Sequence, residues 1–165
     1  MKKFIVACAA ALLPLCAVAA ESPDAAFYMK AAQGGMAEVE LGKLASDKGA
    51  TEGVRDFGKR MVADHTKANE KLKAAAMKSG VKLPADTDAE HKAAKTKLQG
   101  LSGAAFDAAY VESQVKDHEM TIALLEKEIS SGKDADAKAW ATESLPVVKQ
   151  HATMVKSMAG QHAGH

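Results

Sequence analysis

The fold is decided by residues 51–80, which read TEGVRDFGKRMVADHTKANEKLKAAAMKSG. Apolar or small side chains recur there every three or four residues, which is the spacing of one face of an α-helix. Thr51 is a residue type that caps a helix N-terminus, and Gly80 is a type that ends a helix. The pattern therefore predicts one long amphipathic helix. Its inward face carries Val54, Phe57, Met61, His65, Ala68, Leu72 and Ala75.

The same helical period continues on both sides of this stretch. Ser22 and Pro23 suit an N-cap and a first helical position. Pro146 lies inside the last periodic stretch, where it is expected to kink the helix or to leave one carbonyl unpaired. No segment alternates polar and apolar residues with β-branched side chains, so the fold class is all-α. Three further long helices and one short helix are predicted over residues 23–46, 102–132, 134–158 and 89–98.

The lengths of the connections predict the topology. The gaps after the first and third long helices are short, which requires antiparallel hairpins. Residues 80–101 are long enough to cross back along the second helix, whose length is about 42 Å at 1.5 Å per residue. Helices two and three can then run parallel. We therefore expect a ferritin-like four-helix bundle with a long crossover, containing a short helix, between helices 2 and 3.

The first twenty residues differ from the rest. Lys2 and Lys3 precede an apolar run over residues 4–18, and small residues follow, which is typical of a secretory signal peptide cleaved near Ala19 or Ala20. A periplasmic location is therefore predicted. Both cysteines fall in this segment, so the mature domain has no disulfide or thiolate site. The expected divisions are a signal peptide (1–20), a four-helix bundle domain (21–159) and a flexible histidine-containing tail (160–165).

Composition argues against several classes of partner. Lys and Arg number 22 against 21 Asp and Glu, so no strong net field attracts nucleic acid or an anionic membrane surface. After the leader, no apolar stretch approaches the roughly 20 residues of a membrane-spanning helix. Bundles of this kind often form homo-oligomers, and the sequence leaves that state and any protein partner open.

Three histidines lie within the apolar faces, and each has a valine three residues before it. Helix geometry places His65, His118 and His151 at heights of about 20, 22 and 18 Å along the bundle. Glu38 interrupts the first helix's apolar face at about 12 Å. Three imidazoles and a carboxylate form a candidate site for one Zn, Cu, Fe or Mn ion, with neighbouring aspartates orienting the rings.

A second interpretation has equal standing. Buried histidines also donate to a carbonyl or carboxylate on a neighbouring helix and so fix its register, with no metal involved. The protein would then be a non-catalytic structural or envelope-stress interaction module. Both interpretations remain open from the sequence.

Enzymatic activity of the di-iron type is not expected. That site needs Glu-x-x-His on two helices, and valines occupy the glutamate positions at Val62 and Val115. No catalytic residue and no organic cofactor is assigned. Weaker candidate metal ligands are Met61, Met154, His162 and His165, whereas His91 is expected on the solvated crossover.

Five motifs occur in order over about residues 24–158, and they are QGGMAEVELG (33–42), MVADHTKAN (61–69), FDAAYV (106–111), KDHE (116–119) and LPVVKQH (145–151). Together they resemble the bacterial family called domain of unknown function 4142. The resemblance implies an exported, ferritin-like helical bundle with no assigned activity, sometimes labelled an outer-membrane protein. It also implies that Glu38, His65, His118 and His151 are the polar members of the motifs.

Overall fold

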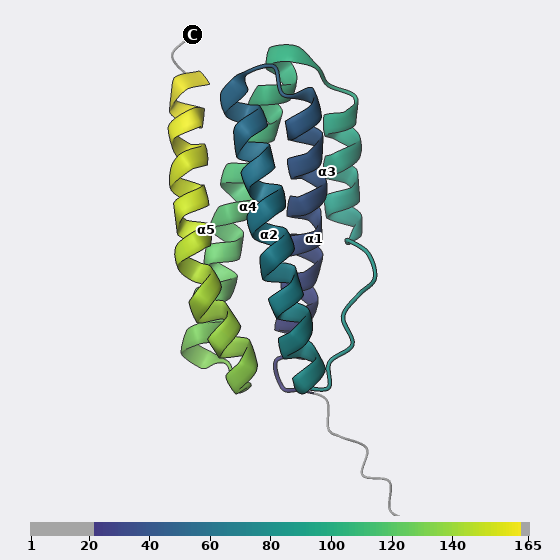
Figure 1. Cartoon of the computed structure of the whole chain (residues 1–165), viewed down its shortest axis with the longest axis vertical. Coiled ribbons are helices and arrows are strands. Elements are labelled where there is room, and N and C mark those ends of the chain that lie inside the picture. Colours follow the sequence, from purple (N-terminus) through teal and green to yellow (C-terminus); the bar gives the residue numbers. More distant parts are fainter. Residues whose placement is uncertain (1–21, 163–165) are drawn as a thin grey trace, which may run out of the picture.

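A computed structural model describes residues 22–162 of the chain, and these residues form helices joined by turns and one long crossover (Figure 1). The described residues contain no strand, as the periodicity predicts. Within residues 22–162, no helix combines the length and the hydropathy of a membrane-spanning segment. In chain order the helices are α1 (Ala25–Lys48), α2 (Glu52–Lys78), α3 (Ala89–Gln99), α4 (Gly103–Ser131) and α5 (Ala135–His162).

The four long helices pack as two antiparallel hairpins, α1 with α2 and α4 with α5. The hairpins meet where α2 packs on α5 and α1 on α4. Between them the chain runs back along the bundle through residues 79–88 and α3, so α2 and α4 point the same way (Figure 1). This arrangement confirms the predicted ferritin-like bundle with a helical crossover.

The helix ends agree with the sequence in some places and differ in others. The Thr51 hydroxyl caps α2 by accepting from the amide of Val54, as predicted. Ser22 does not cap α1, because the helix begins two residues later than expected and the Ser22 hydroxyl donates to Asp134 at 2.6 Å. The last helix passes through Pro146 and ends four residues beyond the predicted boundary. The predicted signal peptide and residues 163–165 of the predicted tail lie outside the described residues.

Asp107 of α4 fixes the tight turn between α1 and α2. Its buried carboxylate accepts from the amides of Ala50 and Thr51 and from the Thr51 hydroxyl, at 2.7–2.9 Å. On either side of this turn, Gly42 of α1 and Gly58 of α2 let the two helix backbones approach each other. A Cβ on either glycine would lie under 3 Å from the carbonyl oxygen of the other glycine. The first hairpin is therefore held in one register against α4.

The core is divided into two apolar clusters along the bundle axis. One contains Phe27, Leu72 and Leu125 and lies toward the end where α1 begins. The other contains Leu41 and Phe57 and lies toward the end where α1 finishes. On each long helix a buried polar residue comes between the two clusters, and these residues are Glu38, His65, His118 and His151. A polar layer thus crosses the middle of the bundle.

Candidate metal centre

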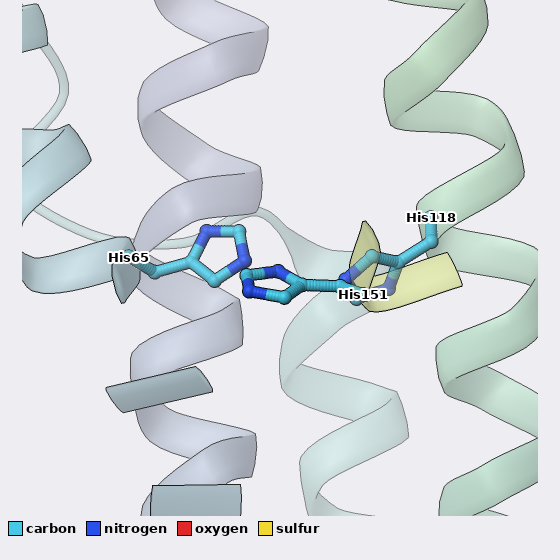
Figure 2. Close-up of side chains that lie close together, drawn as sticks. All are labelled: His65, His118 and His151. Carbon is cyan, nitrogen blue, oxygen red and sulfur yellow. The ribbon is translucent and has the colours of Figure 1, made fainter. Parts of the chain in front are cut away.

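Three imidazole rings from α2, α4 and α5 converge in the polar layer. His65, His118 and His151 each offer a ring nitrogen, and these three nitrogens lie within 4.8 Å of one another. The ring centroids are 5.5–6.1 Å apart. Figure 2 shows the rings extending from their helices into one shared space. Their exposed fractions are 8%, 1% and 0% in that order, so the cluster lies inside the bundle.

Hydrogen bonds on the far side of two rings fix which nitrogen faces the cluster. The Nδ1 of His118 donates to the backbone carbonyl of Gln114, one turn earlier on α4, at 2.9 Å. The Nε2 of His151 donates to the carboxylate of Asp64 on α2 at 2.8 Å. In a neutral imidazole the other nitrogen then carries a lone pair. His118 presents Nε2 in this way, and His151 presents Nδ1.

Each ring has one buried nitrogen without a hydrogen-bond partner among the described residues: Nε2 of His65, Nε2 of His118 and Nδ1 of His151. A buried acceptor without a donor costs about 1–3 kcal/mol, and such groups are uncommon in native proteins. Here three of them come from three helices to one place. The arrangement is that of a ligand set for a cation, and the lone pairs of His118 and His151 are already directed inward.

Burial also sets the charge of the cluster. Loss of water lowers the pKa of His65 to about 3, and its two neighbouring histidines add to that shift. Burial lowers the pKa of His118 to about 4, and it lowers the pKa of His151 against the opposing effect of Asp64. All three imidazoles are therefore neutral near pH 7, the state in which histidine binds metals.

Glu38 lies beside the cluster on the outer side of His118. One carboxyl oxygen accepts from the Gln114 side-chain amide at 2.9 Å, and the other lies 3.8 Å from Nδ1 of His118. Nδ1 is the nitrogen that faces away from the shared space. Burial raises the pKa of Glu38 to about 8, so this carboxyl is mainly neutral near pH 7. The structure therefore brings together the three histidines and leaves Glu38 outside their immediate ligand set.

The sequence matches the family described as Domain of unknown function (DUF4142) over residues 11–158. The chain belongs to the DUF4142 family. No protein with a curated description matches the sequence. The fold is similar to the crystal structure of a DUF305 fragment from Deinococcus radiodurans, with a TM-score of 0.74 and 11% sequence identity. The alignment covers 86% of this chain and 99% of that fragment, and at this identity it shows the ferritin-like helical fold alone.

Among the described residues of this DUF4142 protein, the other candidates take no part in the hydrogen bonds that orient the rings of His118 and His151. Asp117, beside His118 in sequence, makes no hydrogen bond to any of the three rings, and burial raises its pKa. Met61 is packed in the apolar cluster that contains Phe57, with Met154 against it. His91 lies in the first turn of α3 and bonds Asp88 at 2.8 Å.

Two contributors to the site were not found from the sequence. Phe57 covers the cluster on one side, with its ring centroid 6.2 Å from that of His118 and 6.4 Å from that of His151. Gln114 contributes its carbonyl to His118 and its side-chain amide to Glu38. The only signal for Gln114 is its position four residues before a histidine. This signal is not specific, because every histidine within a helix has some residue at that position.

Proposed function

We propose that this DUF4142 protein binds one transition-metal ion through His65, His118 and His151 and acts as an exported metal-binding or metal-buffering bundle. The observation that carries the proposal is the convergence of three buried ring nitrogens without partners among the described residues. A histidine that serves only to pack helices together does not need a nitrogen lone pair directed toward two other imidazoles. A cation at their centre would satisfy all three at once.

The spacing of the nitrogens suits a single ion. Tetrahedral coordination with metal–nitrogen bonds of about 2.1 Å requires nitrogens roughly 3.4 Å apart. The present spacing, up to 4.8 Å, requires each ring to move inward by less than a bond length. Asp64 and the Gln114 carbonyl would hold the rings during that movement, as outer groups do in established metal sites.

The chemistry of the donors favours copper or zinc. Three imidazole nitrogens with no thiolate suit Cu and Zn, and the general order of affinity places Cu²⁺ above Zn²⁺. Manganese prefers oxygen ligands, and non-haem iron sites commonly add a carboxylate. Glu38, the nearest buried carboxyl, is occupied by Gln114 and faces the outer nitrogen of His118. Fe and Mn are therefore weaker candidates than Cu and Zn.

Export to the periplasm is part of the proposal and rests on the leader sequence. Lys2 and Lys3, the apolar run and the small residues before Ala20 fit a secretory signal. Intact-mass analysis of protein from a periplasmic extract should give a mature chain that begins near Glu21. A full-length mass, or recovery in the cytoplasmic fraction alone, would refute export without affecting the metal site.

The structural interpretation has one contact in its favour. The hydrogen bond from His151 on α5 to Asp64 on α2 joins two helices and helps to set their register. His118, however, bonds a carbonyl of its own helix, which fixes no register between helices. A purely structural role accounts for one of the three histidines and leaves the convergence of the others unexplained.

Metal analysis of untagged, leader-free protein tests the proposal. After incubation with Cu²⁺ or Zn²⁺ and dialysis, we expect one ion per chain and a higher melting temperature, because a ligand of the native state stabilises it. His118→Ala should abolish both effects. His91→Ala is the matched control, since His91 is a histidine of the same bundle that lies on α3, outside the cluster.

The tail histidines need a separate control. A double variant, His162→Ala with His165→Ala, removes the imidazoles after Gly160 and should retain one ion per chain. Equal metal content in the wild type and in His118→Ala would refute the proposal, as would an unchanged melting temperature of the wild type on adding metal.

A further inference from the structure

A cavity of about 190 Å³ adjoins the histidine layer on the side away from Phe57. It is bordered by α1, α2, α4 and α5 and reaches His65 and His151, while His118 is not part of its wall. Apart from Asp64, the other residues of α2 and α5 that line the cavity lie on one side of these histidines. That side faces the end of the bundle where α1 begins. The cavity therefore leads from the polar layer toward that end of the bundle.

An ion held by the three histidines would have one accessible side. Phe57 covers the cluster on the opposite side, where its ring lies nearly perpendicular to that of His151 at an interplanar angle of 85°. Three imidazoles leave a tetrahedral metal one position short, and that position is open to an added ligand. Because His65 and His151 line the cavity, a ligand bound in the cavity can reach this open position on the metal.

Beyond the histidines and Glu38, much of the inner wall of the cavity is apolar. Leu125, Trp140 and Val148 contribute to it. The indole N–H of Trp140 already donates to the carbonyl of Ala68 at 3.0 Å, so the ring offers apolar surface rather than a free donor. A Cβ added at Gly34, another lining residue, would meet no atom within 4 Å. The cavity thus has room for a small apolar group beside the metal position.

The charges around the cavity favour an anion. Three lysines line it: Lys30, Lys67 and Lys71. Lys71 pairs with Glu143, whereas Lys30 and Lys67 form no ion pair with any residue in the described part of the chain. A divalent ion with neutral imidazoles adds two positive charges in a buried place, where an uncompensated charge is costly.

The carboxyl groups that face the cavity are already engaged. Asp64 accepts from His151 and lies 3.4 Å from the Arg60 guanidinium, and Glu143 pairs with Lys71. Glu38 accepts from the Gln114 side-chain amide and lies beside the outer nitrogen of His118. The protein therefore supplies little anionic charge of its own to the metal position.

We infer that the cavity binds a short-chain monocarboxylate, whose carboxylate completes the coordination of the metal and whose alkyl part lies against Trp140, Leu125 and Val148. This inference rests on the proposed metal site. It adds a ligand class to that site, a small monoanion with an apolar body. The binding step is ligand exchange: the carboxylate replaces a water on the metal, and no bond within the ligand breaks.

The experiment uses the leader-free protein loaded with Cu²⁺. Azide, a small monoanion, gives a charge-transfer absorption when it binds Cu²⁺, and its titration reports the open position. Butyrate is then titrated against bound azide. We expect a saturable azide band and its displacement by butyrate, with acetate weaker than butyrate because it has less alkyl surface to bury.

Filling the cavity provides the decisive variant. Gly34→Leu places a side chain in the open space and should weaken butyrate binding at least about tenfold, with one Cu²⁺ per chain retained. Gly53→Leu is the matched control, because Gly53 also lies in a helix with open space around its Cβ position but far from the cavity. If Gly34→Leu does not fold, Gly34→Ala gives the same test with one methyl group and a smaller loss.

Each failure has its own meaning. If Cu²⁺ binds and neither azide nor butyrate changes its spectrum, the monocarboxylate inference is wrong and the metal site stands. If butyrate binds equally well to the wild type and to a folded Gly34 variant, the ligand is not in this cavity and the inference is also wrong. If Cu²⁺ does not bind to the wild type, both proposals fall.

Discussion

Asp64 orients the histidine of another helix rather than its neighbour in sequence. Its carboxylate on α2 accepts from Nε2 of His151 on α5 at 2.8 Å, while His65, the next residue along α2, forms no hydrogen bond with it. The carboxylate also lies 3.4 Å from the Nε of Arg60, one turn earlier. The guanidinium thus compensates Asp64, and Asp64 holds the His151 proton on the nitrogen that points away from the cluster.

Removing this carboxylate should weaken metal binding. In Asp64→Ala the His151 ring loses the acceptor that fixes its tautomer and orientation, so we expect metal affinity to fall about 10–100-fold. Isothermal titration with Zn²⁺ measures the change. Asp117→Ala is the matched control, because Asp117 also precedes a cluster histidine but bonds none of the three rings. Equal affinity in the wild type and in Asp64→Ala would contradict a positioning role.

Replacing His118 separates the metal-free stability of the bundle from its response to metal. His118→Leu removes a buried nitrogen that has no partner among the described residues. The Gln114 carbonyl that it bonds keeps its place in the helix. We expect the metal-free variant to be more stable than the wild type by about 1 kcal/mol. Metal should no longer raise its stability.

Urea unfolding with and without Zn²⁺ measures both quantities for this variant. The proposed metal site predicts that Zn²⁺ stabilises the wild type alone. If His118→Leu costs several kcal/mol without metal, His118 is a structural residue whose contacts the bundle requires, and the interpretation of the cluster as a ligand set loses its main support.

Much of this molecule follows from residue spacing. The helical period places Val54, Phe57 and His65 on one inward face, and Thr51 caps that helix as its residue type predicts. The length of the crossover requires parallel second and third long helices. Once that topology is set, a rise of about 1.5 Å per residue is enough to bring three histidines to one depth.

What the spacing does not contain is how each helix is rotated about its axis. Both Asp64 and Asp117 precede a histidine, yet only Asp64 bonds a ring, because α2 turns it toward α5. Glu38 comes near the cluster but on the outer side of His118. Such differences of a few ångströms depend on packing between helices that lie far apart in sequence, so they needed the structure.

Acid should weaken the metal-free bundle through the buried histidines. The folded-state pKa of His118 is about 4, below its ordinary value of 6.5. Stability from the neutral ring is therefore present above pH 6.5 and is lost as the pH falls toward 4. His118→Leu does not have this loss. The difference in free energy of unfolding between the metal-free variant and the metal-free wild type should therefore grow by about 1–3 kcal/mol, in favour of the variant, between pH 6.5 and 4. Urea unfolding at several pH values tests this, and a constant difference would contradict a buried neutral imidazole.

Glu38 should have the opposite dependence on pH. Its folded-state pKa is about 8, above the ordinary value of 4.5, so the neutral carboxyl contributes stability that is lost as the pH rises through 8. Glu38→Gln keeps an acceptor for the Gln114 amide and cannot ionise. Between pH 6.5 and 8.5 we expect the metal-free wild type to lose about 2 kcal/mol relative to this variant. Glu40→Gln, at a half-buried position on the same helix that pairs with Lys95, is the control and should leave the wild-type slope unchanged.

Asp107 should matter to the fold and not to the metal. Its carboxylate accepts three hydrogen bonds from the turn before α2, and it is fully buried. Asp107→Ala leaves two amides and a hydroxyl without this acceptor, so the free energy of unfolding should fall by about 2–4 kcal/mol. Asp56→Ala, which removes an exposed carboxylate paired with Lys59, should leave the free energy of unfolding nearly unchanged. The turn lies at the end of the bundle where α1 finishes, away from the histidine layer. Folded Asp107→Ala, measured below its melting temperature, should therefore still bind one ion per chain. Loss of metal from the folded variant would show that the register of the first hairpin, and with it the position of His65, depends on this one carboxylate.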